Sequence, residues 1–322
     1  MGGRRVLLAG RSVSPAFGGT AVPLTVTWLV WGTTYLAIAF GLRGTEPLTL
    51  SSVRFLTAGL LLWCLAERRR EPPLTPVRRR RATLVGVLLF SVGMGGVALA
   101  EEYVDSGTTA LFIATVPLWS VLLNTVRGRP ARGAEWAGVW LGLAGVAVLS
   151  AGLGRDGLTG ALILLPAAMC WVLGSHLDDH AAGVRGPAAQ MLAGGAALAV
   201  AAAVRGEFAS PPRPTWGAVL ALAYLVVFGS LLAMAAYRHL TAHTGPALAT
   251  SYAFVAPVIA VLSGALFLDE PLTAHVLAGT ALIAVALSTT LLTRSRPVAQ
   301  PLTTAPGHPA RGGRGTGPRH GG

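Results

Sequence analysis

Ten apolar runs, each long enough to cross a lipid bilayer as a helix, dominate this chain of 322 residues. A spanning helix needs about 20 mostly apolar residues, and in lipid the backbone polar groups must bond one another, which a helix achieves. Only 12% of the residues are charged, about half the share of an ordinary soluble domain. We therefore expect an all-α integral membrane protein with ten transmembrane helices. The expected spans are 22–41, 48–66, 82–100, 107–126, 134–152, 158–176, 187–204, 216–237, 247–268 and 273–292.

The arginines predict the orientation of these spans. The net charge is +12, and all 25 basic residues are Arg. They cluster at the ends of the apolar runs, which is typical of membrane loops and argues against a nucleic-acid partner. Twenty lie at the N-terminus, on every second connection or in the C-terminal tail, four lie on the other connections, and Arg54 lies inside a span. By the positive-inside rule we expect both termini in the cytoplasm, Glu67–Arg81 as a cytoplasmic loop, and the lipid of the inner membrane as the immediate partner.

A weak internal repeat divides the chain into two halves. Three pairs of residues share a separation of 140 positions, namely Trp31 and Trp171, Pro47 and Pro187, and Pro117 and Pro257. Each half would hold five spans, and because five is odd the second half must enter the membrane from the opposite side. The expected architecture is therefore two inverted five-helix repeats, a plan that many transporters use to build a site near the midplane. The expected parts are an N-terminal arm (1–21), a first unit (22–152), a second unit (158–292) and a disordered tail (293–322).

Several stretches of sequence resemble a known family. They are Trp31–Tyr35 followed by Val53–Gly59, then Tyr103–Gly107 followed by Val116–Trp119, and finally Ala256–Val258 followed by Leu268–Thr273 and Ala278–Ile283. These motifs are similar to those of the ten-helix branch of the drug/metabolite transporter superfamily, whose members carry two EamA domains. The resemblance covers residues 22–292 and implies export or exchange of small metabolites, such as amino acids, their derivatives or nucleobases. The sequence departs from the family pattern at the polar end of the sixth span, His176–His180.

Arg54 lies about six positions into the second span, where a charge is costly. Two interpretations are open. Its planar guanidinium suits a carboxylate, so Arg54 is a candidate substrate contact that faces a central cavity. Alternatively, Arg54 is structural and bonds backbone carbonyls or Glu46 near the periplasmic face.

Glu101 and Glu102 end the third span on the periplasmic side. A proton-coupled carrier needs a carboxylate whose pKa is raised by burial or by a like charge, and both residues are candidates for that role. Adjacent residues of a helix point about 100° apart, so only one of the two can face a central cavity. The alternative is a solvated helix end at the lipid headgroups.

Aromatic residues and prolines within the spans complete the candidate site. Five aromatic residues lie away from the interfaces where aromatic belts form, and they are candidates for a pocket that stacks on a flat or cationic substrate, the alternative being core packing. They are Trp31, Tyr35, Trp119, Trp171 and Tyr252. Pro117 and Pro257 interrupt the backbone hydrogen bonding of their spans, so each is a candidate hinge or gate, or else a fixed kink.

The sequence carries no enzyme signature that we recognise. The absence of Lys excludes a P-loop, and Cys64 and Cys170 are too few for a disulfide framework or a metal cluster. A cluster at the end of the sixth span has side chains that a divalent metal accepts, but a polar loop explains it equally well. The cluster consists of His176, Asp178, Asp179 and His180. We therefore expect neither a metal site nor a cofactor.

These observations favour a secondary transporter that moves a small-molecule substrate by alternating access, with export as the direction that the family resemblance implies. A second copy of the chain is also a candidate partner, in a homodimer. The rival interpretation is a membrane-embedded enzyme, or a receptor or scaffold without transport. Such an enzyme should place a convergent polar set within its spans, and a receptor should carry a sizeable soluble domain. The sequence shows neither, since only Arg54 is clearly interior.

The arginine distribution predicts the topology. A reporter enzyme that is active only in the periplasm should be silent when fused after Arg294 and active when inserted near Arg155, because the arginine-rich connections stay in the cytoplasm. Reporter activity in intact cells, normalised to the amount of fusion protein, measures this. The reverse pattern would overturn both the orientation and the inverted repeat.

Overall fold

A computed structural model describes most of the chain between its two terminal segments. The described residues are 19–294 without 129–130, 132, 180–182, 210–214, 245–247 and 249–250. The N-terminal arm and the C-terminal tail expected from the sequence lie almost wholly outside this range. Every regular element in the described part of the chain is a helix.

The helices confirm the expected all-α, ten-helix membrane architecture. Eight are long and apolar enough to cross a membrane, and two shorter apolar helices follow them. The first five spans are α1 (Ala21–Leu42), α2 (Pro47–Arg68), α3 with η1 and α4 (Pro76–Gly86, Val87–Gly95 and Gly96–Ala100), α5 with α6 (Ser106–Ile113 and Val116–Val126), and α7 (Gly133–Ala151). The next five are α8 (Arg155–Leu177), α9 (Arg185–Arg205), α10 with η3 and α11 (Trp216–Tyr224, Leu225–Leu232 and Ala233–His243), α13 (Tyr252–Phe267), and α14 (Ala274–Arg294).

The connection after α2 is shorter than the sequence suggested. We expected a loop over Glu67–Arg81, but α3 already begins at Pro76. Thr75 caps this helix, because its side chain accepts a hydrogen bond from the Arg78 backbone N–H, and proline suits the first helical position. The arginine run of this loop therefore continues into the first turns of a helix.

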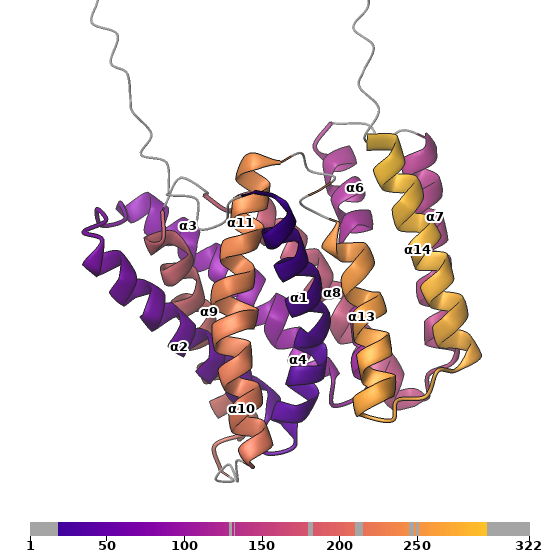
Figure 1. The fold of residues 1–322 in the computed structure, drawn as a ribbon, viewed down its shortest axis with the longest axis horizontal. Helices are drawn as coiled ribbons and strands as arrows, with labels where there is room; N and C mark the ends of the chain where they lie inside the picture. Colours follow the sequence, from indigo (N-terminus) through magenta and orange to yellow (C-terminus); the bar gives the residue numbers. More distant parts are fainter. Residues whose placement is uncertain are drawn as a thin grey trace, which may run out of the picture.

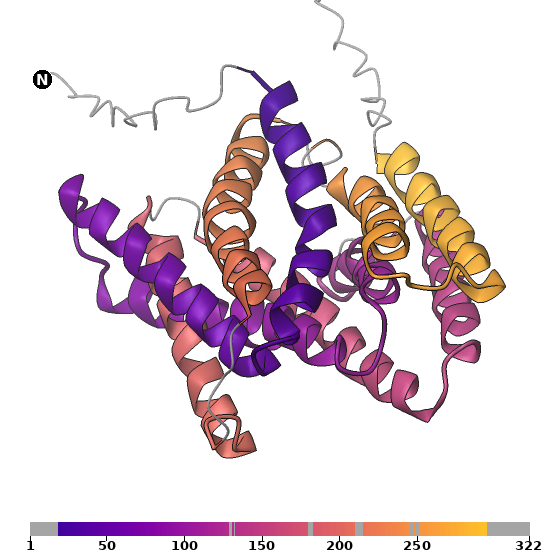
Figure 2. The same ribbon diagram turned by 60° about the horizontal axis from the view of Figure 1, so that its bottom comes forward.

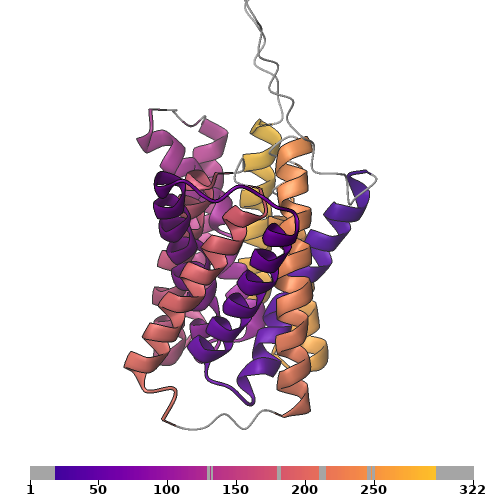
Figure 3. The ribbon, with the colours of Figure 1, turned by 90° about the vertical axis from the view of Figure 1, so that its left-hand side faces the viewer.

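The helices form a bundle with a pair of antiparallel helices at each edge. Figure 1 shows α2 beside α9 at one edge and α7 beside α14 at the other, with α1, α8 and α13 between them. The view in Figure 2 keeps the same pairs together, and Figure 3 shows the helices running from one end of the bundle to the other, some of them tilted. Helix α1 begins and α14 ends at the same end of the bundle, as an even number of crossings requires.

Large apolar side chains cover the outside of this bundle. Trp140 is 67% exposed, Leu162 72% and Leu266 73%. Soluble monomers rarely expose contiguous apolar surface on this scale. Lipid is the solvent that suits such a surface, because it replaces water around apolar side chains.

Helices α2 and α9 approach each other through glycines. A Cβ atom on Gly59 would lie 2.9 Å from the backbone nitrogen of Leu192, and one on Gly195 would lie 2.9 Å from that of Leu56. Small residues let helix backbones approach closely in membranes. The two contacts are reciprocal: Leu56 and Leu192, like Gly59 and Gly195, are 136 positions apart. This separation differs from the 140 positions of the sequence repeat.

The same two helices cap each other's N-termini with glutamates. Glu207, just after α9, accepts hydrogen bonds from the backbone N–H groups of Leu48 (3.3 Å) and Thr49 (2.8 Å) in α2. Glu71, just after α2, accepts from those of Val184 (3.0 Å) and Arg185 (2.9 Å) at the start of α9. Each carboxylate satisfies N–H groups that have no partner within their own helix and is favoured by the helix dipole.

A third glutamate caps the N-terminus of α5. Glu270, in the connection between α13 and α14, accepts from the backbone N–H groups of Ser106 (2.8 Å) and Gly107 (3.0 Å). Asp105 occupies the N-cap position of α5 but forms no side-chain cap there. The cap is therefore supplied by a residue more than 160 positions away.

Three spans are irregular near their centres. The third and the eighth contain the π-helical segments η1 and η3, and such segments are often found at functional sites. The fourth span breaks at Ala114 and Thr115, just before Pro117 in the first turn of α6. The proline ring excludes the carbonyl one turn earlier and removes a donor, which explains the break. Pro257, in contrast, lies inside a continuous α13.

The contact between α3 and α9 predicts a test of the packing. A Cβ atom on Gly86 would lie 2.1 Å from the backbone carbonyl oxygen of Gln190, so Gly86→Ala must push the helices apart and should destabilise the protein by about 1–3 kcal/mol. Gly217→Ala is the matched control, because its nearest neighbour would be Thr215 Oγ1 at 3.7 Å. Thermal unfolding of the detergent-purified proteins should show a lower midpoint for Gly86→Ala alone. Equal midpoints would contradict the close backbone contact.

Candidate functional site

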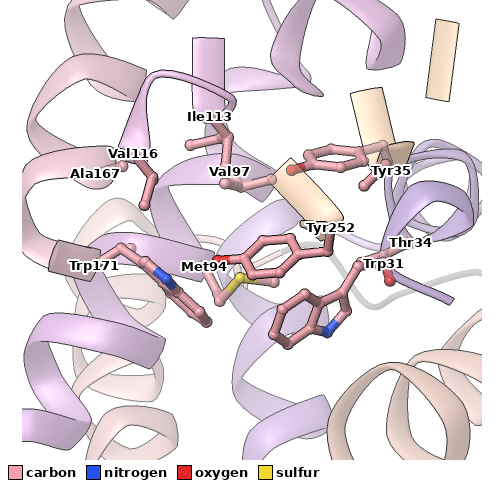
Figure 4. Close-up of a pocket in the computed structure, with 12 residues that line it drawn as sticks. Trp31, Thr34, Tyr35, Met94, Val97, Ile113, Val116, Ala167, Trp171 and Tyr252 are labelled. Atoms are coloured by element: carbon pink, nitrogen blue, oxygen red, sulfur yellow. The ribbon is translucent and has the colours of Figure 1, made fainter. Parts of the chain in front are cut away.

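A pocket opens between helices of the two halves of the chain. About 550 Å³ of atom-free space lies within it, part of which is open to the surroundings. Its walls come from α1, η1, α4, α8 and α13, and from both sides of the break between α5 and α6 (Figure 4). The lining residues are Trp31, Thr34, Tyr35, Gly93, Met94, Val97, Ile113, Val116, Ala167, Trp171, Tyr252 and Ala256.

Four of the six residues predicted to contact substrate line this pocket: Trp31, Tyr35, Trp171 and Tyr252. The Trp31 ring centroid lies 4.4 Å from that of Tyr252 and 6.2 Å from that of Trp171, in edge-to-face arrangements. Tyr237 of α11 packs behind them, 5.2 Å from Trp31. Figure 4 shows the Trp31, Trp171 and Tyr252 rings gathered near Met94, with Tyr35 lying toward Val97 and Ile113. None of the twelve lining residues carries a charge.

The other two predicted contacts, Arg54 and Trp119, are not among the lining residues. Trp119 is half-buried on α6. Pro117 and Pro257 do not line the pocket either, but the residue before each of them, Val116 and Ala256, does. Each proline is therefore next to a lining residue in the chain.

Arg54 lies directly behind the pocket wall. Its side chain is buried, and its Nε donates a hydrogen bond of 2.9 Å to Ser230 Oγ of η3. Its Cζ lies 4.8 Å from the centre of the Phe55 ring. A Cβ atom on Gly229 would lie 3.1 Å from Arg54 Nη2 and 3.6 Å from Thr34 Oγ1, so the guanidinium end is adjacent to a lining residue. Among the described residues, the side-chain hydrogen bond of Arg54 is thus to Ser230.

The two neighbouring glutamates occupy different environments. Glu102 is exposed and forms an ion pair of 2.5 Å with Arg205. Both carboxylate oxygens of Glu101 are buried and have no hydrogen-bond partner among the described residues. Burial, and secondarily the charge of Glu270, raise the pKa of Glu101 well above its ordinary value, against the opposing charge of Arg54. Of the two candidates, Glu101 is the one with a buried carboxylate and a raised pKa.

The polar cluster at the end of α8 forms ion pairs. Asp178 accepts from Gln190 Nε2 (2.5 Å) and Arg238 Nη1 (3.1 Å), and Asp179 pairs with Arg78 at 3.1 Å. His176 Nδ1 lies 2.9 Å from the Val172 carbonyl oxygen. The fourth member of the cluster, His180, lies outside the described residues. Over the described part of the chain, no group of three His, Cys, Asp or Glu residues could hold a metal ion.

Sequence reasoning missed the aliphatic side of the pocket. Met94, Val97 and Ile113 lie in apolar runs that carry no local signal of function. The π-helical geometry that brings Gly93 and Met94 to the pocket has no sequence signature either. The break before Pro117 was the one available clue, because Ile113 and Val116 flank it.

Comparison with known proteins identifies the family. The profile of the EamA-like transporter family matches residues 22–151 and 158–292. The chain is 39% identical over 261 residues to "Uncharacterized inner membrane transporter YedA" of Escherichia coli K12, an alignment that covers 79% of this chain and 83% of the relative. It is 28% identical over 278 residues to "Uncharacterized transporter YvbV" of Bacillus subtilis, with 82% and 88% covered.

A solved crystal structure shares the fold. Its TM-score is 0.62, and the match covers 86% of this chain and 99% of the other at 20% sequence identity. At that identity the likeness concerns the fold alone. The family match over both halves and the apolar helices together lead to one conclusion: this chain is a multi-pass membrane protein that belongs to the EamA-like transporter family.

Proposed function

We propose that this transporter carries a small, flat metabolite, such as an aromatic amino acid, an amino-acid derivative or a nucleobase, across the inner membrane. The observation that carries this proposal is the uncharged, aromatic-lined pocket between the two halves of the chain. Aromatic walls stack on flat molecules and attract cations. An anion without a positive group would find no positively charged partner on the lining itself.

Alternating access by two inverted units is the mechanism that fits this arrangement best. The reciprocal contacts of α2 and α9, with glycine against leucine in the middle and glutamate caps at both ends, are those of two helices related by a local twofold axis. The π-helical segments in the third and the eighth spans lie in corresponding positions of the two halves. Such symmetry lets one half rock against the other around a fixed central site.

The moving parts would adjoin the pocket. Pro117 follows the break between α5 and α6, and Pro257 lies inside α13; in both cases the preceding residue is on the pocket wall. Proline removes a backbone hydrogen bond, so each position is a weak point where a helix can bend and close one side. We propose export as the direction by analogy with the family.

The rival interpretation, an intramembrane enzyme, receives no support from this pocket. Catalysis needs a general acid, a base or a nucleophile within reach of the substrate. The ionisable groups on the lining are the hydroxyls of Tyr35 and Tyr252. Transport needs only binding on one side and release on the other, which these walls suit.

Exchange across a membrane tests the proposed substrate class. The purified chain is reconstituted into liposomes, and the exchange of labelled phenylalanine, adenine and 1-methylnicotinamide is measured at equal pH on both sides. The three probes represent a zwitterion, a neutral base and a flat cation. Exchange of at least one probe above that of protein-free liposomes supports the proposal. Exchange of none of them would refute this substrate class.

Removing an aromatic wall should weaken transport. Trp171→Ala should lower the exchange rate of the transported probe at low concentration by about tenfold, because one aromatic contact contributes on the order of 1.4 kcal/mol. Trp140→Ala is the matched control, since Trp140 is 67% exposed on α7 and is not a lining residue. Equal rates for the two variants, at equal amounts of folded protein, would show that this pocket does not bind the substrate.

A further inference from the structure

Glu101 and Arg54 each lie next to a lining residue of the pocket without lining it themselves. Glu101 follows the lining residue Val97 by one helical turn, so the two share a face of the helix. Arg54 adjoins Thr34, as described above. The two ionisable groups therefore flank the wall built by Thr34, Tyr35 and Val97.

The two groups compensate each other in charge but do not touch. Among the described residues, no ion pair within 4.0 Å joins them. Arg54 has five N–H donors and one side-chain hydrogen bond, to Ser230. The Glu101 oxygens have none. A buried charge is stable only when it is paired and hydrogen-bonded. The ionised form of Glu101 is therefore only partly stabilised, and its carboxylate can bind a proton.

Three charged or titratable groups face Glu101 from neighbouring elements. Arg54 of α2 favours its ionised form, and Glu270 of the α13–α14 connection disfavours it. Tyr35 of α1 is the third. Glu270 is held in place as the cap of α5, where its carboxylate accepts two backbone N–H groups. Glu101 thus has one neighbour that favours its ionised form, Arg54, and one that disfavours it, Glu270.

We propose that Glu101 binds and releases the proton that drives transport, and that Arg54 is the internal counter-charge that replaces this proton when Glu101 is ionised. This inference rests on the proposed transport function. In each cycle one proton binds a Glu101 oxygen from one aqueous phase and leaves to the other, while the substrate moves in the opposite direction unchanged. A bound proton adds one positive charge beside the pocket and so disfavours a positively charged substrate group. Such competition is the linkage that exchange of a proton for a substrate requires.

The neighbouring Glu102 provides a matched control. It precedes the same connection and carries the same side chain, but it is exposed and paired with Arg205. Any effect of general surface charge at this end of the bundle should be shared by the two positions. An effect that depends on the buried carboxylate should appear only when Glu101 is substituted.

Infrared spectroscopy of the purified protein tests the proton site without a substrate. The wild type should show a carboxylic-acid C=O band that persists at a pH where exposed carboxyl groups are already ionised and disappears at higher pH, because burial keeps the Glu101 proton bound. The band should be missing in Glu101→Gln and retained in Glu102→Gln. A wild type without such a band, or a band that survives in Glu101→Gln, would overturn the assignment.

A pH gradient tests the coupling in the reconstituted liposomes. The ratio of gradient-driven to equal-pH transport of the exchanged probe should be several-fold in the wild type and in Glu102→Gln, and it should fall to about one in Glu101→Gln. A Glu101→Gln variant that keeps the wild-type ratio would refute the proposal. If none of the three probes exchanges in the wild type, the proposed substrate class fails, while the infrared titration still decides the proton site.

Substitution of Arg54 tests its role as counter-charge. Arg54→Gln removes the positive neighbour and should move the midpoint of the infrared titration to higher pH by about 1–3 units. Arg43→Gln, at an exposed position, should leave it unchanged. If Arg54→Gln does not fold, the double variant Arg54→Gln/Glu101→Gln should recover expression, because it removes both buried charges. An unshifted midpoint, or no recovery, would contradict the pairing.

Discussion

Polar groups inside an apolar bundle must find their partners within the protein, and this constraint shapes the whole molecule. Helix N-termini carry N–H groups without intrahelical partners, and hydrocarbon offers none. Glu71, Glu207 and Glu270 supply them from neighbouring elements. These carboxylates tie helix ends together across the two halves of the chain. Glu101 differs from these three residues, because its buried oxygens have no such donor in the part of the chain that the structure describes.

The tight contacts and the irregular ones lie in different parts of the bundle. At the edges, α2 with α9 and α7 with α14 pack glycine against leucine. Around the pocket the helices are interrupted by η1 and by the break before Pro117, while η3 meets Arg54 just behind the wall. Close packing resists deformation, whereas helices with missing hydrogen bonds bend more easily. The helix pairs at the edges of the bundle are thus closely packed, whereas the helices around the pocket can bend. A transporter that changes conformation around a central site needs both.

Much of the fold was predictable from the sequence, because hydropathy and length define a membrane helix. The aromatic side of the pocket was predictable as well, since Trp31 and Tyr252 stand out within apolar spans. The partner of Arg54 and the buried environment of Glu101 were not predictable. Ser230 lies 176 positions from Arg54, and no local pattern links them. The choice between Glu101 and Glu102 depends on which face of one helix is buried, and a rotation of about 100° decides it.

Alternating access around the central pocket is the central claim, and distances between spin labels test it most directly. One label pair, at Val77 and Val126, spans one end of the bundle, and a second pair, at Val204 and Phe267, spans the other; all four side chains are exposed. Pulsed electron spin resonance in nanodiscs is recorded with and without the probe that exchanges. The account predicts that the probe shortens the distances at one end and lengthens them at the other. Distances that change in the same sense at both ends, or at neither, would contradict it.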